Sequence, residues 1–269
     1  MKNLIAITSL LAAGTALANA DYVWNNTQNY NYTWDFGASN TQNGQPGVLG
    51  GTVTNTFVTE TIDNGETALK KGSSAGGYWE VGTNSFFYDA LSEVSKVDST
   101  ASLTFTLDYY WTGESRWGEC IFHVGQVDTG ISLGLAPNGY ISLITTSVND
   151  AHFTESKTDV QLTANIWQTI SVTISGGQWF ASLGEQTSNA MTLGALTWAS
   201  DEAERNKYSI GVKAPGYTGG TTGLNDSGCK LANISVSYSG IPEPSAFGLL
   251  AGAGALALVA ARRRRTKKA

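Results

Sequence analysis

The stretch that decides the fold is residues 101–111, which read Ala-Ser-Leu-Thr-Phe-Thr-Leu-Asp-Tyr-Tyr-Trp. From position 103 onwards its odd positions are large and apolar, whereas its even positions up to 108 are polar. Alternation with a period of two, in a segment rich in aromatic and β-branched residues, is typical of a half-buried β-strand. One face of this strand is therefore expected to point into a core, and it consists of Leu103, Phe105, Leu107, Tyr109 and Trp111.

The same alternation recurs along the chain, at residues 131–135, 169–175, 179–183, 208–212 and 232–238, with further strand candidates at 53–58 and 78–81. Pro137-Asn138-Gly139 and Gly176-Gly177 separate strands and supply residues that accept the positive φ of tight turns. Helical periodicity is almost absent, apart from a possible short turn at 201–206. The sequence predicts an all-β chain, with one domain over residues 21–240 folded as a two-sheet antiparallel jelly-roll sandwich.

The order of strands and turns from 101 to 239 resembles the concanavalin A-like/laminin-G-like (LamG-like) jelly roll. The matching pieces are the 101–111 strand, Cys120-Ile-Phe-His-Val-Gly125, Ile131-Ser-Leu-Gly-Leu135 with its Asn138-Gly139 turn, the 167–174 strand and the closing 231–238 strand. By analogy of fold, the resemblance implies non-covalent binding of a glycan or another extracellular polymer.

The C-terminus carries a separate pattern. A motif, an apolar run and a basic cluster follow one another: Ile241-Pro242-Glu243-Pro244-Ser245, residues 246–261, and Arg262, Arg263, Arg264 and Arg265. The prolines favour an extended, accessible backbone. As a helix, the apolar run would be about 24 Å long, slightly short for a bilayer core. The run therefore predicts a single transmembrane helix. The arginines that follow it are expected to hold the C-terminus in the cytoplasm.

This tail resembles the PEP-CTERM sorting signal of Gram-negative bacteria, with Pro242, Glu243 and Pro244 as the sorting motif. The resemblance implies that a membrane-embedded exosortase cuts at or near the motif. The mature protein would then be released or attached at the cell surface, often among exopolysaccharide. An ordinary C-terminal membrane anchor is the alternative interpretation.

The N-terminus has the form of a secretory signal peptide. Lys2 precedes an apolar stretch over residues 4–17, and Ala18-Asn19-Ala20 is an A-x-A cleavage site. Signal peptidase is therefore expected to cut after Ala20, following export through the Sec translocon. The expected locations are the inner membrane for the precursor and the cell surface or extracellular matrix for the mature form.

The predicted domain is strongly acidic. Residues 21–240 hold nine of the sixteen Lys and Arg residues and twenty-one of the twenty-two Asp and Glu residues, which gives a net charge of −12. Nucleic acids and anionic lipids are bound by basic patches. Neither is therefore expected as a partner.

The sequence contains two cysteines, Cys120 and Cys229. An even number in an exported chain predicts a disulfide between them, with two separate buried thiols as the alternative. A zinc site is not expected, because only His123 and His152 could join the cysteines and the spacing fits no zinc pattern. Calcium is a further option at two loops that also have the form of ordinary turns, Asp63-Asn64-Gly65-Glu66 and Asn225-Asp226-Ser227.

Aromatic side chains are the candidates for ligand binding, because a flat ring can stack on the C–H face of a sugar. Tyr30, Tyr32 and Trp34 share one face of a predicted strand, and packing of that face into the core is the alternative. Trp117 lies in an apparent loop and is a further candidate. Trp167 shares the polar face of its strand, so we expect it at an end of the sandwich.

No catalytic residues are predicted. Concanavalin A-like glucanases often align carboxylates in a Glu-x-Asp-x-x-Glu strand, and this sequence contains no such motif. Glu114 and Glu119 would fall on opposite faces of a regular strand, and Glu202 and Glu204 lie in a charged turn. The fold resemblance and the expected location at the cell surface imply a non-catalytic glycan-binding or exopolysaccharide-binding protein. A glycoside hydrolase or lyase, or a structural matrix protein without a specific ligand, are the alternatives.

Overall fold

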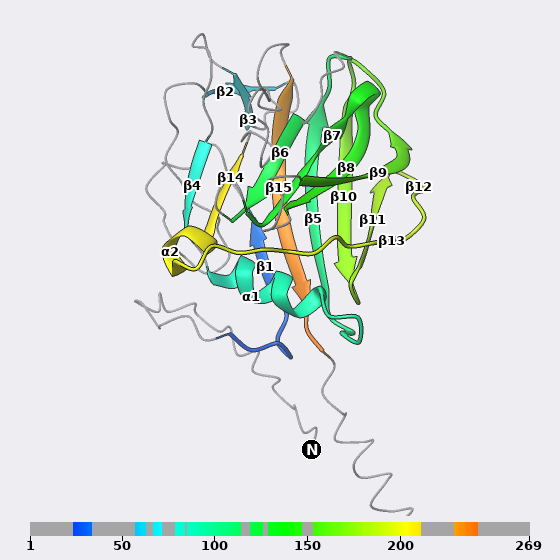
Figure 1. Ribbon diagram of the computed structural model, residues 1–269. Coiled ribbons are helices and arrows are strands. Elements are labelled where there is room, and N and C mark those ends of the chain that lie inside the picture. Colours follow the sequence, from blue (N-terminus) through cyan, green and yellow to red (C-terminus); the bar gives the residue numbers. More distant parts are fainter. Residues whose placement is uncertain are drawn as a thin grey trace, which may run out of the picture.

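The computed structural model describes residues 24–33, 57–62, 67–71, 79–83, 85–113, 119–125, 129–146, 153–210 and 229–241. These residues form two antiparallel β-sheets with a shared hydrophobic core and short helices (Figure 1). The prediction of a two-sheet antiparallel sandwich is confirmed.

The first sheet, sheet A, has nine strands. Its main path is β12 (Gln186–Thr187), β11 (Gln178–Leu183), β10 (Trp167–Ser175), β5 (Ser102–Tyr110), β15 (Lys230–Ser239), β3 (Thr67–Lys71) and β2 (Phe57–Thr61). In addition, β1 (Tyr30–Thr33) pairs with β15, and β13 (Met191–Thr192) pairs with β11. The strand predicted from the 101–111 alternation is therefore β5, which lies between β10 and β15.

The second sheet, sheet B, has six strands. Their order is β4 (Trp79–Thr83), β14 (Lys207–Ile210), β6 (Glu119–Val124), β7 (Ile131–Ala136), β8 (Tyr140–Thr146) and β9 (Phe153–Gln161). A short 3-10 turn, η1 (Pro137–Gly139), joins β7 to β8. Asn138 and Gly139 have φ angles of 67° and 79°, which is the left-handed conformation that the sequence predicted for this turn.

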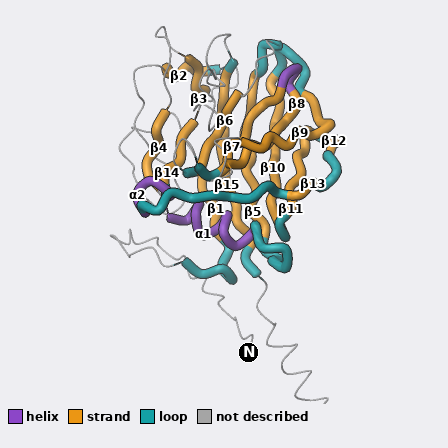
Figure 2. The backbone as a smooth tube through the Cα atoms, in the orientation of Figure 1, coloured by secondary structure: helices purple, strands orange, loops and turns teal. Residues whose placement is uncertain are grey.

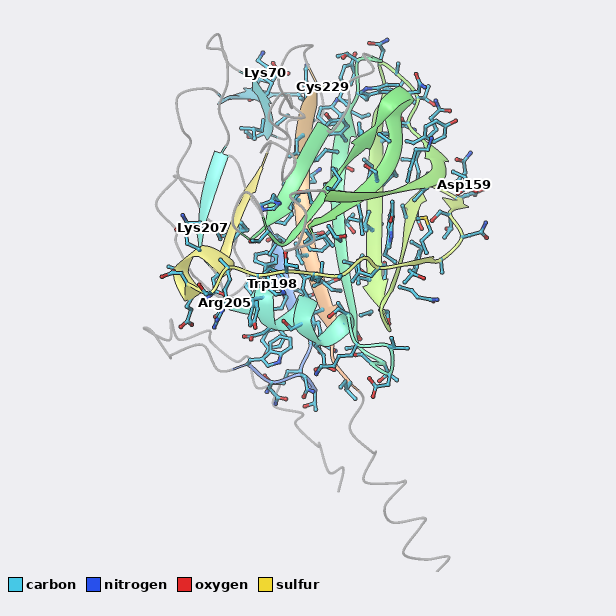
Figure 3. All side chains as sticks on the ribbon, in the orientation of Figure 1. Lys70, Asp159, Trp198, Arg205, Lys207 and Cys229 are labelled. Atoms are coloured by element: carbon cyan, nitrogen blue, oxygen red, sulfur yellow. The ribbon has the colours of Figure 1, made fainter. Side chains whose placement is uncertain are left out.

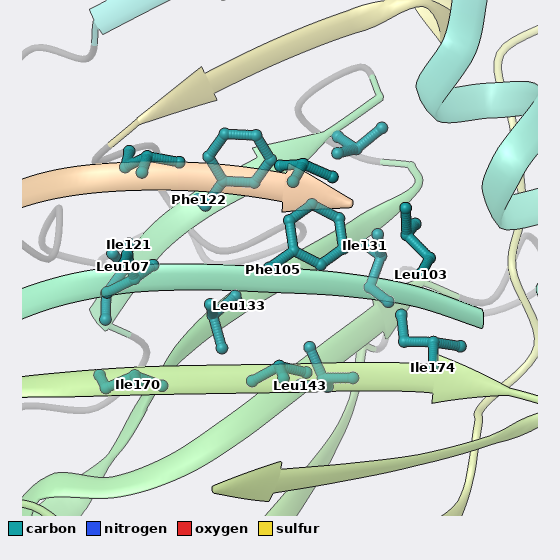
Figure 4. Packing of buried hydrophobic residues seen from close by; sticks show 14 of the residues in the cluster. Leu103, Phe105, Leu107, Ile121, Phe122, Ile131, Leu133, Leu143, Ile170 and Ile174 are labelled. Carbon is teal, nitrogen blue, oxygen red and sulfur yellow. The ribbon is translucent and has the colours of Figure 1, made fainter. Parts of the chain in front are cut away.

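The core lies between the two sheets. Every odd position of the 103–111 alternation is buried, as predicted. Figure 4 shows Phe105 of sheet A near Phe122 of sheet B, and their ring centroids are 5.4 Å apart. Ile131 and Leu133 of β7 belong to the same cluster. The buried apolar face of each sheet is therefore the main source of stability, as expected for a sandwich.

One helix was not expected from the sequence. Helix α1 (Ser85–Val94) turns its apolar side inward, and its fully buried apolar side chains are Phe86, Phe87, Ala90, Leu91 and Val94. These positions fall on one helical face, because residues one, four and five apart can share a stripe about 100° wide. The backbone N–H of Gly177, in the turn after β10, donates to the carbonyl of Val94 at 2.9 Å. The helix thereby joins the end of sheet A, beneath β5 in Figure 1.

A long connection, residues 193–200, is called the strap; Figure 2 shows it running from β13 to α2 (Glu202–Arg205). At one end the N–H of Leu193 donates to the carbonyl of Gly177 at 2.8 Å, and further along the N–H of Gly130 donates to the carbonyl of Thr197 at 2.7 Å. The ring of Trp198 packs on Tyr88 of α1 at 5.1 Å. The strap therefore connects both sheets with the helix. The predicted helical turn at 201–206 is confirmed as α2.

Several sequence predictions concern residues that lie outside the described ranges. These are the signal peptide with Ala18 and Ala20, the motif at Pro242, Glu243 and Pro244, the apolar run, and the arginines from Arg262 to Arg265. Within the described ranges, no helix is long and apolar enough to cross a membrane.

Candidate binding face

The outer face of sheet A carries the candidate site. Along β5, buried residues alternate with half-buried ones, so the even positions from Ser102 to Tyr110 point away from the core. The pairing register places them in cross-strand rows with β10 on one side and β15 on the other. The face is thus an ordered grid, in which chemically similar side chains from distant parts of the sequence are neighbours.

One row contains two aromatic and two basic residues. Trp167 of β10 pairs with Tyr110, Tyr110 pairs with Lys230 of β15, and Lys230 pairs with Lys70 of β3. The rings of Tyr110 and Trp167 are 5.8 Å apart and inclined by 58°. The Nζ atom of Lys230 lies 5.5 Å from the centre of the Tyr110 ring, within the range of a cation–π contact. Both rings are half-buried, so each presents part of its surface to solvent.

The two lysines of this row share one carboxylate. Glu60 of β2 forms an ion pair with Lys230, Oε1 to Nζ, at 2.5 Å and a second ion pair with Lys70 through Oε2. Hydrogen bonds from Lys230, and to a smaller extent from Lys70, lower the pKa of Glu60 below its ordinary value of 4.5. Partial burial of the carboxylate acts in the opposite direction. Glu60 therefore fixes the positions of both ammonium groups at the edge of the aromatic pair.

The next row is centred on Asp108. Its Oδ1 accepts a hydrogen bond from the hydroxyl of Thr169 at 2.5 Å, and its Oδ2 accepts one from the side-chain amide of Asn233 at 2.7 Å. Asn233 lies where the pairing of β15 with β5 shifts register, and its φ is +51°. A β-bulge of this kind redirects a side chain, and Asn233 is exposed beside Asp108 as a result. Sheet bulges are frequent at functional sites.

Hydroxyl pairs continue the grid beyond Asp108. Thr106 lies 3.1 Å from the hydroxyl of Ser171, and Thr104 lies 2.9 Å from that of Thr173. All four side chains are short and half-buried. The aromatic row therefore stands at one end of a low, polar surface. Figure 3 labels Lys70 and Cys229 at this end and Trp198 and Arg205 near the opposite end.

The arrangement suits an uncharged polyhydroxylated ligand. The rings of Tyr110 and Trp167 offer apolar surface to the C–H face of a sugar. Asp108, Asn233 and Thr169 offer acceptors and donors fixed by mutual hydrogen bonds. The formal charges of Lys70, Lys230, Glu60 and Asp108 balance, which distinguishes this face from the strongly acidic remainder of the domain.

Two of the predicted ligand-binding residues have another role. Tyr32 is only 6% exposed and packs on Phe86 of α1 with ring centroids 4.5 Å apart. Tyr30 is half-buried and stacks on Trp24 at 5.4 Å. Tyr32 therefore follows the alternative of packing into the core, because β1 pairs with β15 and turns this side chain towards α1. Tyr30 packs against the edge of the same core and keeps part of its surface exposed. Trp34 and Trp117 lie outside the described residues.

The predicted disulfide between Cys120 and Cys229 stays a prediction, because the side chain of Cys120 lies outside the part of the chain that the structure describes. Cys229 is buried. Its Sγ lies 3.5 Å from Oγ1 of Thr112. Cys120 belongs to β6 of sheet B, whereas Cys229 directly precedes β15 of sheet A.

His123 is buried in sheet B and hydrogen-bonded to Ser132, Nδ1 to Oγ, at 2.7 Å. Within the described part of the chain, no group of three or more His, Cys, Asp or Glu residues could hold a metal ion. The two calcium candidates, at residues 63–66 and 225–227, lie outside that part.

None of the residues on this face is among the ligand-binding residues predicted from the sequence, although part of the signal was present. The 101–111 alternation already placed Asp108 with the outward-facing positions, and Trp167 had been assigned to the polar face of its strand. What alternation could not supply was the register that brings Trp167, Tyr110 and Lys230 into one row. Register depends on turns and bulges far from the site.

The Glu60 ion pairs predict a pH-dependent contribution to stability. Because the folded-state pKa of Glu60 is lowered, the contribution is present above the unfolded pKa and is lost as the pH falls through the folded pKa. Glu60→Gln should therefore reduce the free energy of unfolding more at pH 7 than at pH 3. Urea titrations at both pH values measure this difference, with the exposed Glu185→Gln as control. An equal effect of Glu60→Gln at both pH values would contradict the prediction.

No family model matches the chain. The search of curated proteins likewise gave no match.

Solved structures show distant likenesses. The CBM40 of the IT-sialidase from Ruminococcus gnavus is 12% identical with a TM-score of 0.45, covering 64% of this chain and 90% of that one. A Shewanella oneidensis MR-1 protein of unknown function is 11% identical with a TM-score of 0.49, covering 79% and 87%. Botulinum neurotoxin type C, which needs interaction with two ganglioside molecules to enter cells, is 12% identical with a TM-score of 0.46, covering 72% and 44%. This chain therefore spans less than half of that neurotoxin chain. At such similarity, the ligands of these proteins do not transfer to it.

Proposed function

We propose that the chain is an exported, non-catalytic glycan-binding protein of the concanavalin A-like/LamG-like jelly-roll class, which binds an uncharged glycan on the outer face of sheet A. The observation that carries the proposal is the pair of neighbouring rows, Tyr110 and Trp167 beside Asp108 and Asn233. Aromatic surface next to fixed polar groups is the usual composition of a small-molecule binding site.

Binding, not hydrolysis, fits the chemistry of this face. Glycoside hydrolysis uses two carboxyl groups, one on each side of the scissile bond, and one of them must exchange a proton with the sugar. Here both oxygens of Asp108 accept hydrogen bonds from Thr169 and Asn233, and Glu60 is held between two lysines. Each carboxylate is thereby fixed as a positioning group.

The cellular address rests on the two termini. We propose that residues 1–20 are removed by signal peptidase after export through the Sec translocon, and that an exosortase processes the tail at Pro242, Glu243 and Pro244. The apolar run with Arg262 to Arg265 would hold the precursor in the inner membrane. The mature form would belong to the cell surface or the exopolysaccharide matrix of a Gram-negative bacterium, where a glycan ligand is available.

The position of the binding row supports display away from the membrane. Lys230 begins β15 beside Tyr110, and Ser239 ends it next to the tail. The ten residues of this strand span about 30 Å. The aromatic row thus lies at the end of sheet A that is remote from the proposed membrane attachment.

Direct binding tests the proposed function. The secreted domain should bind at least one soluble neutral polysaccharide in a panel containing a β-glucan, a mannan and a galactan, measured by isothermal titration calorimetry. Weaker binding to a uronate polymer is expected, because the face has no surplus of positive charge. Absence of binding to every neutral and acidic glycan tested would favour a structural matrix protein instead.

The proposed sorting motif predicts a clear processing defect. Replacing Pro242, Glu243 and Pro244 with alanine should leave the full-length precursor in the inner membrane, because the stiff extended motif that the protease recognises is lost. Immunoblots of membrane and culture fractions measure the precursor and the mature form. Replacing the nearby Ser245 with alanine provides the control. Normal processing of the triple variant would contradict the assignment of the motif.

A further inference from the structure

The two described ends of the domain meet at one end of the sandwich. Strand β1 runs antiparallel to β15, and the register pairs Tyr30 at the start of β1 with Tyr238 near the end of β15. In Figure 1 the blue segment before β1 therefore lies next to the orange end of β15. Residues 24–29, which precede β1, are called the N-terminal turn.

Three hydrogen bonds hold the end of β15 to the N-terminal turn. The N–H of Ile241 donates to the carbonyl of Asn26 at 2.7 Å, and the N–H of Gly240 donates to Oδ1 of Asn29 at 3.0 Å. The hydroxyl of Tyr238 donates to the same Asn26 carbonyl at 3.1 Å. Burial raises the pKa of Tyr238, so its phenol remains a neutral donor.

The turn and the chain end also fit together sterically. A Cβ on Gly240 would lie 2.5 Å from the carbonyl carbon of Thr27 and 2.7 Å from the backbone oxygens of Asn26 and Gln28. No larger residue fits there unless the turn moves away. Ile241 itself is half-buried against the core.

The N-terminal turn is held together by its own hydrogen bonds and by ring contacts. The N–H of Thr27 donates to Oδ1 of Asn25 at 3.0 Å, and the N–H of Gln28 donates to the Asn25 carbonyl at 3.1 Å. Trp24 anchors the turn, since its ring lies 5.4 Å from that of Tyr30 and 4.9 Å from that of Tyr238.

We propose that the N-terminal turn is a latch on Gly240 and Ile241, and that proteolytic processing of the tail cuts on the carboxyl side of Ile241. The proposal rests on the sorting function assigned to residues 242–244. A protease binds its substrate as an extended segment with accessible backbone groups, whereas the amides of Gly240 and Ile241 are already bonded to the turn. The mature protein therefore keeps Ile241, and the latch protects the last strand of the domain from further trimming.

Limited proteolysis of the full-length chain in detergent tests the latch directly. With a broad-specificity protease and intact mass measurement, the protected fragment of the wild type should end at Ile241 or later. Gly240→Ala should open the latch and give fragments that end within residues 236–240, formed at least ten times faster. Gly184→Ala is the matched control, because Gly184 lies in another turn and a Cβ there has no neighbour within 4 Å. A wild-type fragment ending before Ile241, or identical cleavage of Gly240→Ala and wild type, would overturn the latch.

Processing in a host that carries the sorting protease tests the position of the cut. The mature chain should end at Ile241 or later when its C-terminal peptide is sequenced by mass spectrometry. A mature chain that ends before Ile241 would overturn the proposed cut while leaving the sorting function intact. A chain that is never processed would refute both the sorting function and the cut, whereas the proteolysis experiment still decides the latch.

Discussion

Replacing Phe87 with alanine is expected to lower the free energy of unfolding by about 3–5 kcal/mol, the usual cost of removing a large buried ring. Phe87 is fully buried in α1. The centroid of its ring lies 6.4 Å from that of Phe105 in sheet A. In sheet B, the ring centroids of Phe122 and Tyr208 lie 5.9 Å and 4.9 Å away. The substitution would thus leave a cavity where the helix and both sheets meet, and neither sheet alone can close it.

Denaturant unfolding followed by circular dichroism measures this loss. Tyr88→Ala is the matched control, because Tyr88 is the next residue of the same helix but is half-buried and packs on Trp198 of the strap. We expect the control to cost about 1 kcal/mol, typical of a partly exposed side chain. A cost below about 1 kcal/mol for Phe87→Ala would mean that α1 is not part of the core.

Removing either ring of the aromatic row is expected to weaken glycan binding at least about 30-fold, or about 2 kcal/mol, as for a central aromatic contact in an interface. Trp167→Ala and Tyr110→Ala each delete one ring of a pair whose centroids are 5.8 Å apart. Because the two rings support each other, the double variant should lose less binding free energy than the two single variants lose in sum.

Calorimetric titration with the best neutral glycan measures these losses. Trp198→Ala provides a matched control, since Trp198 is half-buried like Trp167 but lies on the strap against Tyr88. The control should bind as the wild type does. Thermal unfolding of all variants distinguishes a lost contact from a lost fold. Unchanged affinity of a folded Trp167→Ala variant would refute the proposed site.

Much of the fold was predictable from local pattern. Strand β5 follows from alternation alone, because one buried face imposes a period of two. The turns after β7 and β10 follow from Asn138-Gly139 and Gly176-Gly177, which adopt positive φ as expected. Helix α1 was missed even though its apolar residues have helical spacing. Its Phe-Phe-Tyr segment is short and rich in aromatic residues, so the pattern clearly favours neither a helix nor a strand. Contacts with both sheets make the segment a helix.

The site was less predictable than the fold. Tyr30 and Tyr32 lie on one face of β1, and Tyr110 lies on the outer face of β5. Alternation in the sequence cannot tell which of these two faces is covered by a helix. Tyr32 is buried because Phe86 of α1 lies against it. Tyr110 stays partly exposed because its neighbours in the row are Trp167 and Lys230.

The most direct test of the central claim, that the outer face of sheet A binds a glycan, is an NMR titration of the isotope-labelled secreted domain with the neutral polysaccharide fragment that binds best. We predict that shifts concentrate on the Trp167 indole and on the amides around Tyr110, Asp108 and Asn233, while the strap and sheet B stay unchanged. Shifts confined to sheet B or to the end near Trp198 would contradict the account.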